Sequence, residues 1–378
     1  MKICIVNLQS LPVLAPGFEH ERVGGEEIQA PLIAQALARR GHDVALVVGD
    51  YGQADGARYS GVKTLKAFRE RAGIPILRYA YPRWTKLWRA LVRADAQVYY
   101  VSCAGMMVGL TAMFCRKHGR GLVFRAASDS DCDPGKLLVR YWRDRKLYEH
   151  GLRRADAVLV QSAFQQESMR QNYRIDSEPA RMLVDRPDGQ VDDARKDIDL
   201  LWVANLRHVK RPDRVLDLAA RLPHLRIHMA GGEFPGESAL YARIAEVARQ
   251  RPNITFHGQV TYRNIGALFD RAKIFINTSE LEGFPNTLLQ AWIRGLPVVT
   301  TFDPDKTVTR EGLGIRVSDP AEMATAASRI LGDPVEFEAL RQRCLAHMAT
   351  HYDEEALLQP YIRAMETAIA AASRRRAV

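Results

Sequence analysis

The stretch ELEGFPNTLLQAWIRGLPVV, residues 280–299, combines an acidic loop, a helix and the start of a strand. Gly283 and Pro285 break the chain after the acidic residues, and a helix is expected from Asn286 onward. The sequence GLP at 295–297 then marks a second turn, which leads into the apolar, β-branched run of a buried strand. A loop, a helix and a buried strand in this order are typical of a parallel α/β sheet.

The same pattern of short apolar runs between helical segments extends along the whole chain. Five runs lie in the first half and five in the second: residues 3–6, 44–48, 98–101, 122–124, 158–160, 200–203, 225–230, 254–256, 274–276 and 298–301. Strands that alternate with helices form parallel sheets covered on both faces. The sequence therefore predicts an α/β protein with two Rossmann-like, doubly wound domains facing each other across a cleft, where ligands bind outside the carboxyl ends of the strands.

Composition places the boundary between these domains at residues 176–197, which are rich in Asp, Pro and Gly and show little periodicity. We expect an N-terminal domain at 1–178, a linker at 179–198 and a C-terminal domain at 199–355. Residues 356–378 are expected to form a C-terminal helix and tail that pack back on the N-terminal domain.

Charge is distributed unevenly between the two halves. The chain has a net charge of +10, and residues 1–180 alone carry +9. Such an excess indicates an anionic partner of the N-terminal half: a phosphorylated substrate, a membrane surface or nucleic acid. The five cysteines show no CxxC spacing, which favours reduced thiols over a zinc site and, with no apolar run of membrane-spanning length, predicts a cytoplasmic protein.

Residues 63–93 hold nine basic residues and a single acidic one. Within them Trp84 and Trp88 fall on the apolar face of a predicted helix, while Lys86 falls elsewhere. A basic amphipathic helix with Trp on its apolar side can lie in the interface of an anionic membrane, which here would be the inner face of the plasma membrane. The alternative is a helix whose apolar face packs on the core and whose basic face is solvated.

Gly24 and Gly25 stand directly before a predicted helix. Bare backbone and a helix N-terminus together favour an anion, although an ordinary loop-to-helix turn has the same sequence appearance. No GxGxxG pattern follows a candidate strand, which argues against an enzyme that uses a nicotinamide or flavin dinucleotide.

Two polar loops follow strands at their carboxyl ends. The loop after residues 200–203 carries four potential cations, namely Arg207, His208, Lys210 and Arg211. Cations in this position suit a pyrophosphate, whereas a solvated charged loop is the alternative. The sequence SDSDCD at 128–133 lacks the Gly and Glu that an EF-hand requires, so we interpret it as a loop of turn-forming Asp residues.

Residues 282–290 read E-G-F-x-x-x-x-x-Q before a helix and resemble the E-x7-E motif of glycosyltransferase family 4, a family of retaining enzymes with the GT-B fold. Glu282 matches the first Glu of the motif, which contacts the donor sugar in the family. Gln290 replaces the second Glu, which contacts the nucleotide ribose, and an amide can still hydrogen-bond hydroxyl groups without charge.

The resemblance extends along nearly the whole chain in order and spacing. VANLRHVKRPD at 203–213 is similar to the family's phosphate loop, in which an Arg and a Lys hold the diphosphate. Lys210 falls on the Lys; the Arg position holds Asn205, so the missing charge is assigned to Arg207. Family members often have a His near the end of an N-domain strand, where this chain reads FRAASDSD and offers Ser128 or Asp129 instead.

The resemblance implies the following assignments. The catalytic residues are Glu282, Lys210 and Arg207. The donor-binding residues are Gly24, Gly25, Asn205, Gly231, Gly258, Gly283, Phe284, Pro285, Asn286, Thr287 and Gln290. On the acceptor side the resemblance suggests Ser128 and Asp129, and the basic amphipathic segment adds Trp84, Lys86 and Trp88. No metal or other cofactor is expected, because Lys210, Arg207 and a helix N-terminus would stabilise the charge that develops on the departing diphosphate.

The function implied is retaining transfer of a hexose from a UDP- or GDP-linked donor to a glycan or a polyprenyl-diphosphate-linked acceptor in cell-surface polysaccharide synthesis. One alternative is a nucleotide-sugar epimerase of the same fold, which would need no acceptor. A second alternative is a basic nucleic-acid-binding protein; because no recognition motif accompanies the basic residues, nucleic acid is not the expected partner.

Overall fold

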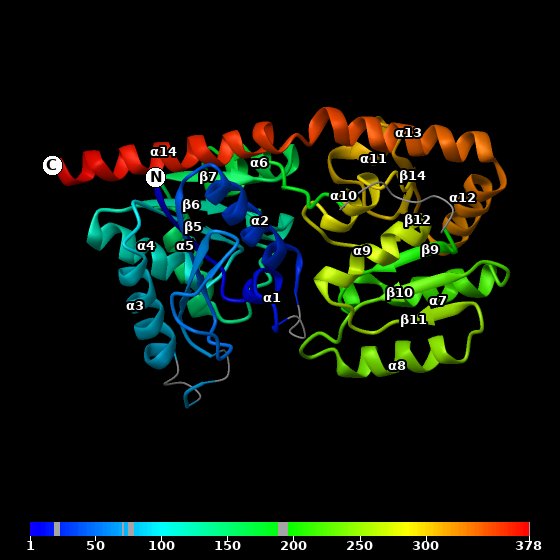
Figure 1. Ribbon diagram of the computed structural model, residues 1–378, viewed down its shortest axis with the longest axis horizontal. Coiled ribbons are helices and arrows are strands. Elements are labelled where there is room, and N and C mark those ends of the chain that lie inside the picture. Colours follow the sequence, from blue (N-terminus) through cyan, green and yellow to red (C-terminus); the bar gives the residue numbers. More distant parts are fainter. Residues whose placement is uncertain (19–22, 70–71, 75–78, 188–195, 378) are drawn as a thin grey trace. The chain divides into compact units, whose positions relative to one another are not determined.

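The computed structural model describes residues 1–18, 23–69, 72–74, 79–187 and 196–377 (Figure 1). Its contacts divide the chain into two units. Unit 1 consists of Met1–Leu183 and Glu354–Val378, and unit 2 of Val184–Asp353. The first division lies inside the expected linker at 179–198, and residues 188–195 of that linker lie outside the described part of the chain.

Unit 1 is built on a sheet with the strand order β3-β4-β2-β1-β5-β6-β7-β8. Its strands are β1 (Lys2–Val6), β2 (Asp43–Val48), β3 (Arg58–Tyr59), β4 (Val62–Lys66), β5 (Val98–Ser102), β6 (Gly121–Arg125), β7 (Ala157–Val160) and β8 (Glu178–Pro179). All neighbouring strands pair in parallel except β3 and β4, which form an antiparallel pair at one edge.

Helices cover both faces of this sheet. They are α1 (Leu11–Leu14), α2 (Gly25–Arg39), α3 (Thr85–Ala94), α4 (Met106–His118), α5 (Trp142–Leu152), α6 (Ala163–Tyr173) and α14 (Glu354–Ala377). Side chains such as Cys4, Tyr99 and Phe124 face a core shared with α3 to α6. Their neighbours along the strands, such as Ile5 and Tyr100, are equally buried. Because both faces are covered, the strands read as continuous apolar runs rather than as alternating ones.

Helix α14 is the last element of the chain and packs on the sheet of unit 1 (Figure 1). Gly121 on β6 allows this close approach, because a Cβ atom there would lie 2.7 Å from the backbone of Ala368. The Tyr361 hydroxyl donates a hydrogen bond to the carbonyl of Arg181 at 2.9 Å, and Arg363 forms an ion pair with Glu178. These contacts join residues 354–377 to the first 183 residues.

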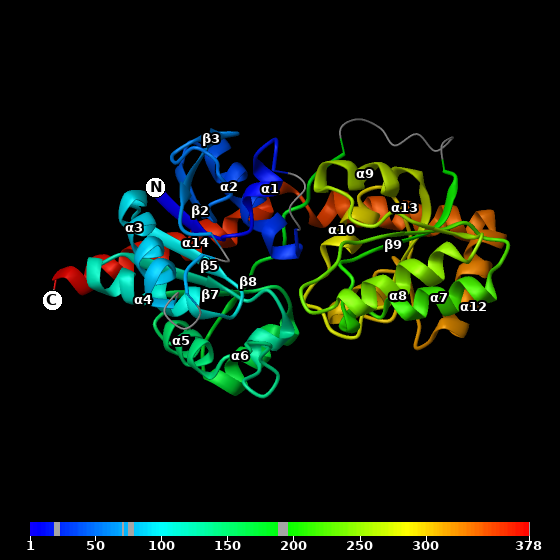
Figure 2. The same cartoon turned by 90° about the horizontal axis from the view of Figure 1, so that it is seen from below.

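Unit 2 contains a six-stranded, fully parallel sheet with the order β11-β10-β9-β12-β13-β14. Its strands are β9 (Ile198–Val203), β10 (Ile227–Ala230), β11 (Ile254–Phe256), β12 (Ala272–Asn277), β13 (Val298–Thr300) and β14 (Gly314–Arg316). Its helices are α7 (Pro212–Arg221), α8 (Ser238–Arg249), α9 (Tyr262–Arg271), α10 (Asn286–Trp292), α11 (Thr307–Arg310), α12 (Pro320–Gly332) and α13 (Pro334–His351). Figure 2 shows α7, α8 and α12 side by side along one face of this unit, with α9 and α10 on the other.

The structure confirms all ten strands that the sequence predicts and, within the described ranges, adds four. The additional strands are β3, β4, β8 and β14. Three of them are only two or three residues long, and β4, VKTLK, mixes two Lys and a Thr with its apolar residues. These strands lie at or near a sheet edge. They form because a neighbouring strand pairs with them, and their own sequences are not apolar enough to predict a strand.

The glycine after β10 is required by the sheet itself. Gly231 donates its backbone N–H to the carbonyl of Gly258 at 2.8 Å. A Cβ atom on Gly231 would lie 1.8 Å from the carbonyl oxygen of Ala204, which is part of the backbone and cannot yield. The ends of β9, β10 and β11 therefore come so close together that only glycine fits at this position.

We predict that Gly231→Ala destabilises unit 2 and lowers the melting temperature by several degrees, because the added methyl group forces two strand ends apart. Gly232→Ala is the matched control, since a Cβ atom there meets only the flexible Gln259 side chain at 3.1 Å. Thermal melts of both variants, followed by circular dichroism, make the comparison. Equal melting temperatures for the two variants would contradict the steric explanation.

Candidate active site

The loops after β9 and β12 lie at the point where the strand order of unit 2 reverses. Strand β9 pairs with β10 on one side and β12 on the other. The chain continues from β9 into α7 and from β12 into α10, and these two helices lie on opposite faces of the sheet (Figure 2). In open α/β sheets this switch point, at the carboxyl ends of the strands, is the place where ligands bind.

Lys210 and Glu282 meet at this switch point. The Nζ atom of Lys210 lies 2.5 Å from Oε1 of Glu282, and the two side chains are 18% and 13% exposed. Lys210 ends a short 3-10 helix, His208–Lys210, after β9, and Glu282 lies in the loop between β12 and α10. The sequence predicts both residues as functional, and the structure brings them into direct contact although they are distant along the chain.

Hydrogen bonds connect the loop after β9 to the loop after β12. Thr278 donates its hydroxyl to the carbonyl of Lys210 at 2.7 Å, and Trp202 on β9 donates its indole N–H to the same hydroxyl at 2.9 Å. The backbone N–H of Glu280 donates to the carbonyl of Val209 at 2.9 Å. Because Trp202 and Thr278 are both buried, these bonds fix the backbone that carries Lys210.

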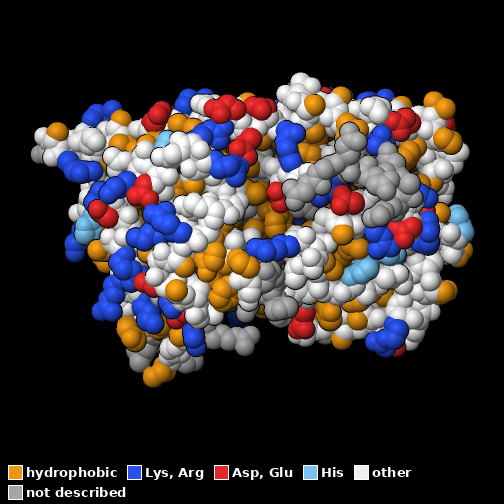
Figure 3. All heavy atoms as spheres, viewed as in Figure 1, with side chains coloured by type: hydrophobic (Ala, Val, Ile, Leu, Met, Phe, Trp, Pro, Cys, Tyr) orange, Lys and Arg blue, Asp and Glu red, His pale blue; other side chains and the backbone are white. Residues whose placement is uncertain are grey.

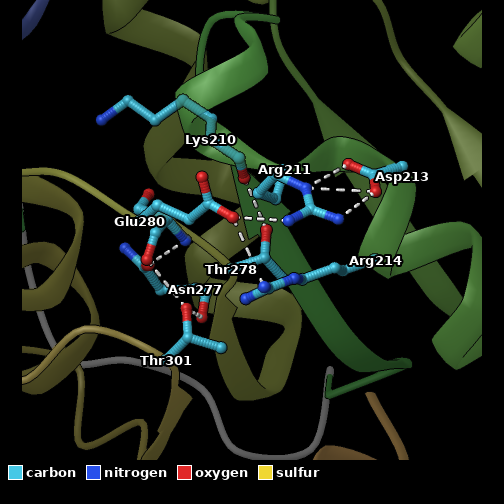
Figure 4. A network of polar contacts seen from close by, with 9 residues as sticks. Lys210, Arg211, Asp213, Arg214, Asn277, Thr278, Glu280 and Thr301 are labelled. Atoms are coloured by element: carbon cyan, nitrogen blue, oxygen red, sulfur yellow. Dashed lines mark hydrogen bonds and ion pairs between the residues drawn. The ribbon is translucent and has the colours of Figure 1, made fainter. Parts of the chain in front are cut away.

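Arg211 is held by two carboxylates of unit 2 and not by Glu282. Its guanidinium forms an ion pair with Asp213 at 2.7 Å and another with Glu280 at 2.5 Å. Figure 4 shows this guanidinium between the two carboxylates, with the Lys210 side chain pointing away from it. These hydrogen bonds raise the pKa of Arg211 and lower that of Asp213. The four cations of the loop thus differ in role, and Arg211 serves to position α7.

Arg207 and His208 also have partners outside the Lys210–Glu282 pair. The Arg207 guanidinium carbon lies 4.4 Å from the centre of the Phe234 ring, in cation–π geometry. His208 contacts Glu237 through Nδ1 at 2.5 Å, while its side chain is 77% exposed. The assignment of Arg207 to the phosphate remains a prediction, because the structure shows its guanidinium against the β10–α8 loop.

The residues that follow Glu282 in the 282–290 motif lead into α10. Gly283 and Pro285 are buried, and the Phe284 ring meets Trp292 edge-on with centres 6.1 Å apart. Asn286 and Thr287 are the first two residues of α10 and are partly exposed, as is Gln290 one turn later. Asn205, partly exposed, lies between β9 and the 3-10 helix that carries Lys210. Gly258, two residues after the end of β11, has a φ of +63°.

Unit 1 has a matching switch point, where β1 pairs with β2 and β5. Gly24 is the N-cap of α2, and Gly25 is its exposed first residue. One residue later, Glu26 forms a buried ion pair with Arg125 at the end of β6, with Oε2 and Nη1 2.9 Å apart. Burial raises the pKa of the Glu26 carboxyl, and the Arg125 charge opposes that shift. The pair was not predicted from the sequence, in which Arg125 is one more charged residue at the end of an apolar strand.

The loop after β6 contains Ser128 and Asp129. The Ser128 side chain accepts a hydrogen bond from the Ser130 N–H at 3.3 Å, and Asp129 accepts one from the Gln165 amide at 2.9 Å. Asp131 accepts the backbone N–H groups of Ala127 and Ser128, and burial raises its pKa to about 6. Asp131 therefore acts as a turn former, which agrees with the interpretation from sequence, whereas the Asp129 carboxylate is held by Gln165 of α6.

Trp84 and Trp88 pack toward the core of unit 1. Trp88 on α3 meets Phe114 of α4 edge-on at 5.1 Å, and Trp84 meets Tyr79 at 6.0 Å. Both Trp side chains are partly buried against the core, whereas Lys86 is partly exposed. The packing corresponds to the alternative of a core-packed helix with a solvated basic face. Residues 70–71 and 75–78 of the 63–93 segment lie outside the described part of the chain.

Comparisons with known proteins define the class that this fold and site belong to. Residues 24–184 match the family described as "Glycosyl transferase 4-like domain", and residues 197–333 match "Glycosyl transferases group 1". These two matches and the two parallel-sheet units identify the GT-B fold of glycosyltransferases. The two matches together take in most of the chain, so it belongs to the family 4-like glycosyltransferases, as the resemblance of its motifs predicts.

Individual relatives support the same fold. D-inositol 3-phosphate glycosyltransferase from Mycolicibacterium paratuberculosis is 32% identical over 183 residues, which is 45% of this chain and 41% of the relative, so the match spans about two fifths of its length. Sucrose-phosphate synthase from Thermosynechococcus elongatus superposes with a TM-score of 0.78 at 19% identity, over 98% of this chain and 99% of that one. HepE from Anabaena, solved with UDP and glucose, gives 0.75 at 15% identity, over 97% and 100%.

We predict that Arg125→Met lowers the free energy of unfolding by about 3–5 kcal/mol, because it leaves the Glu26 carboxylate buried without its partner. The double variant Glu26→Gln/Arg125→Met should be more stable than Arg125→Met alone, since no buried charge then remains unpaired. Urea denaturation of the three proteins measures the difference. A double variant no more stable than the single one would show that the ion pair is not the source of the loss.

Proposed function

We propose that this protein is a retaining hexosyltransferase that uses a nucleotide sugar, UDP- or GDP-linked, as its donor. The observation that carries the proposal is the Lys210–Glu282 pair at the switch point of unit 2. A cation and a carboxylate in contact match the two ends of a nucleotide sugar, because the diphosphate needs positive charge and the sugar hydroxyls need a hydrogen-bond acceptor.

In the proposed reaction Lys210 contacts the diphosphate and Glu282 accepts hydrogen bonds from the sugar hydroxyls. As the bond between the sugar and the phosphate breaks, negative charge grows on the departing oxygen, and Lys210 stabilises it. Backbone N–H groups at the start of α10, from Asn286 onward, are directed away from the helix and can bind the same diphosphate. The acceptor hydroxyl attacks the anomeric carbon from the face that the phosphate leaves and passes its proton to the departing diphosphate, so the configuration is retained.

The proposal includes no metal or other cofactor, because Lys210 and backbone donors supply the positive charge that a divalent cation supplies in other transferases. Arg207 would add a second charge only if its side chain leaves Phe234 when the donor binds. Chelation with EDTA is therefore expected to leave turnover intact. Loss of turnover that manganese or magnesium restores would overturn this part of the proposal.

The acceptor is proposed to be anionic. Lys and Arg side chains gather over α3 and α4 of unit 1 (Figure 3), and residues 1–180 carry the excess positive charge. A polyprenyl-diphosphate-linked glycan fits this charge and the proposed role in cell-surface polysaccharide synthesis. The name of the mycobacterial relative favours a second candidate, a phosphorylated polyol such as an inositol phosphate. Transfer assays with both acceptors separate them, and sugar epimerisation without any acceptor would favour the epimerase instead.

We predict that Glu282→Ala lowers kcat/KM by about 100-fold or more, because it removes a contact to the sugar in the transition state.

Lys210→Ala should weaken binding of the nucleoside diphosphate much more than binding of the free nucleoside, since the lost partner is a phosphate charge. Initial rates and calorimetry provide the two measurements. Arg214→Ala is a control for Lys210, because Arg214 contacts Glu280 at 3.4 Å and not Glu282.

Near wild-type turnover by a folded Glu282→Ala protein would exclude the proposed contact to the sugar. Equal losses of nucleoside and nucleoside diphosphate affinity in Lys210→Ala would exclude the proposed contact to the diphosphate. Because the two residues also bind each other, the double variant is informative: its loss should be smaller than the product of the single losses.

Peripheral contact with an anionic membrane through residues 63–93 is part of the proposal. Among the described residues, no helix is both long enough and apolar enough to cross a bilayer. The Trp rings of this segment pack on the core, so attraction between its basic side chains and lipid headgroups would supply the binding. Arg89 is exposed, and Lys86 is partly exposed.

We predict that the protein floats with vesicles that contain anionic phospholipid, and that binding falls as salt rises, because ions screen the attraction. Lys86→Glu/Arg89→Glu should reduce flotation, whereas Arg221→Glu/Arg243→Glu, which reverses two exposed charges of unit 2, should not. Binding that is independent of anionic lipid would contradict the proposal. The variant Trp84→Ala/Trp88→Ala should lose thermal stability, since both rings pack in unit 1.

A further inference from the structure

Two histidines and a glutamate converge on the α11–α13 side of unit 2. One possible ligand atom from each of Glu311, His347 and His351 lies within 4.8 Å of the others. Among the described residues, no other group of three or more His, Cys, Asp or Glu side chains brings its possible ligand atoms this close together. We infer that these three residues bind a divalent zinc ion.

Local structure explains why the three side chains meet. His347 and His351 are four residues apart on α13, so they project from the same face of the helix, with ring centres 4.8 Å apart. Glu311 is the C-cap of α11 and comes from a separate segment, just before β14. Two ligands from one helix and one from another element are a common way to build a metal site.

The chemistry of the set favours zinc over calcium or magnesium. Imidazole nitrogen is a good ligand for zinc and a poor one for calcium and magnesium, which prefer oxygen. Two neutral imidazoles and one carboxylate leave a fourth tetrahedral position for water.

Neighbouring side chains limit the movement of the proposed ligands. The His347 ring lies 5.8 Å from the buried Trp292 ring and 5.8 Å from Tyr352. Oε1 of Glu311 accepts a hydrogen bond from Nε of Arg310 at 2.8 Å, which orients the carboxylate. A carboxylate has two oxygens with several lone pairs, so Arg310 and a metal can share it. Competition from Arg310 lowers the expected affinity without blocking the site.

A zinc ion here would act as a cross-link within unit 2. It would join the segment between α11 and β14 to the last turn of α13, which ends at His351 just before the chain passes from unit 2 to unit 1 at Asp353. A metal bound by the folded protein only, through residues distant in the sequence, raises the stability of the fold. The proposed role is structural, because the site lies on elements other than those that carry Lys210 and Glu282.

The test uses the untagged full chain, freed of metal with a chelator and titrated with zinc chloride against a chromophoric indicator. The wild type should bind one zinc per chain with a Kd near or below about 1 µM, and excess zinc should raise its melting temperature by several degrees. Glu311→Gln and His351→Ala should each weaken binding at least about 10-fold. Both replace partly exposed or exposed side chains, so the variants are expected to fold.

Two control variants keep the result specific. His224→Ala removes an exposed histidine of unit 2 outside the cluster, and His228→Ala breaks the contact of His228 with His257 at 3.0 Å, the other close histidine pair of that unit. Neither should change zinc affinity. Absence of stoichiometric binding, or equal affinity in wild type and His351→Ala, would overturn the inference. Turnover at room temperature should be the same for wild type and His351→Ala, which keeps this test independent of the proposed transferase activity.

Discussion

The pairing of β9 with β10 on one side and β12 on the other is the constraint on which the proposed active site depends. It sends the chain to opposite faces of the sheet from two adjacent strand ends, so two short loops meet with no helix between them. The close approach of the strand ends leaves room only for glycine at position 231. The buried hydrogen bond between Trp202 and Thr278 then fixes the backbone beside Lys210. The contact of Lys210 with Glu282 is thus a product of topology as much as of the two side chains.

Much of this arrangement could be predicted from sequence. Apolar runs as long as those of β1, β5 and β9 are buried on both faces, so their pattern alone identified them, and the motif around Glu282 indicated the family. Partners across the fold could not be predicted in the same way. Arg211 and Lys210 are adjacent cations in the sequence, and only the positions of Asp213 and Glu280 show that Arg211 is held in ion pairs while Lys210 reaches Glu282.

A similar limit explains what was missed in unit 1. Glu26 and Arg125 each look like an ordinary charged residue at the end of an element, and their burial depends on helices from distant parts of the chain. Trp88 of α3 shows a second case, in which the sequence leaves a membrane-facing helix and a core-packed helix open and the structure shows aromatic packing with Phe114 of α4. Hydrophobic periodicity identifies which face of a helix is apolar, but it does not identify what covers that face.

Helix α14 has a consequence for how the polypeptide acquires its structure during synthesis. Unit 2 is continuous in sequence, whereas unit 1 needs residues from both ends of the chain. During synthesis the strands of unit 1 emerge before unit 2, but the helix that covers Tyr100 and Gly121 follows only with residues 354–377. The middle of the protein can therefore complete its core before the beginning does, and in that interval the exposed strands are a natural target for chaperones.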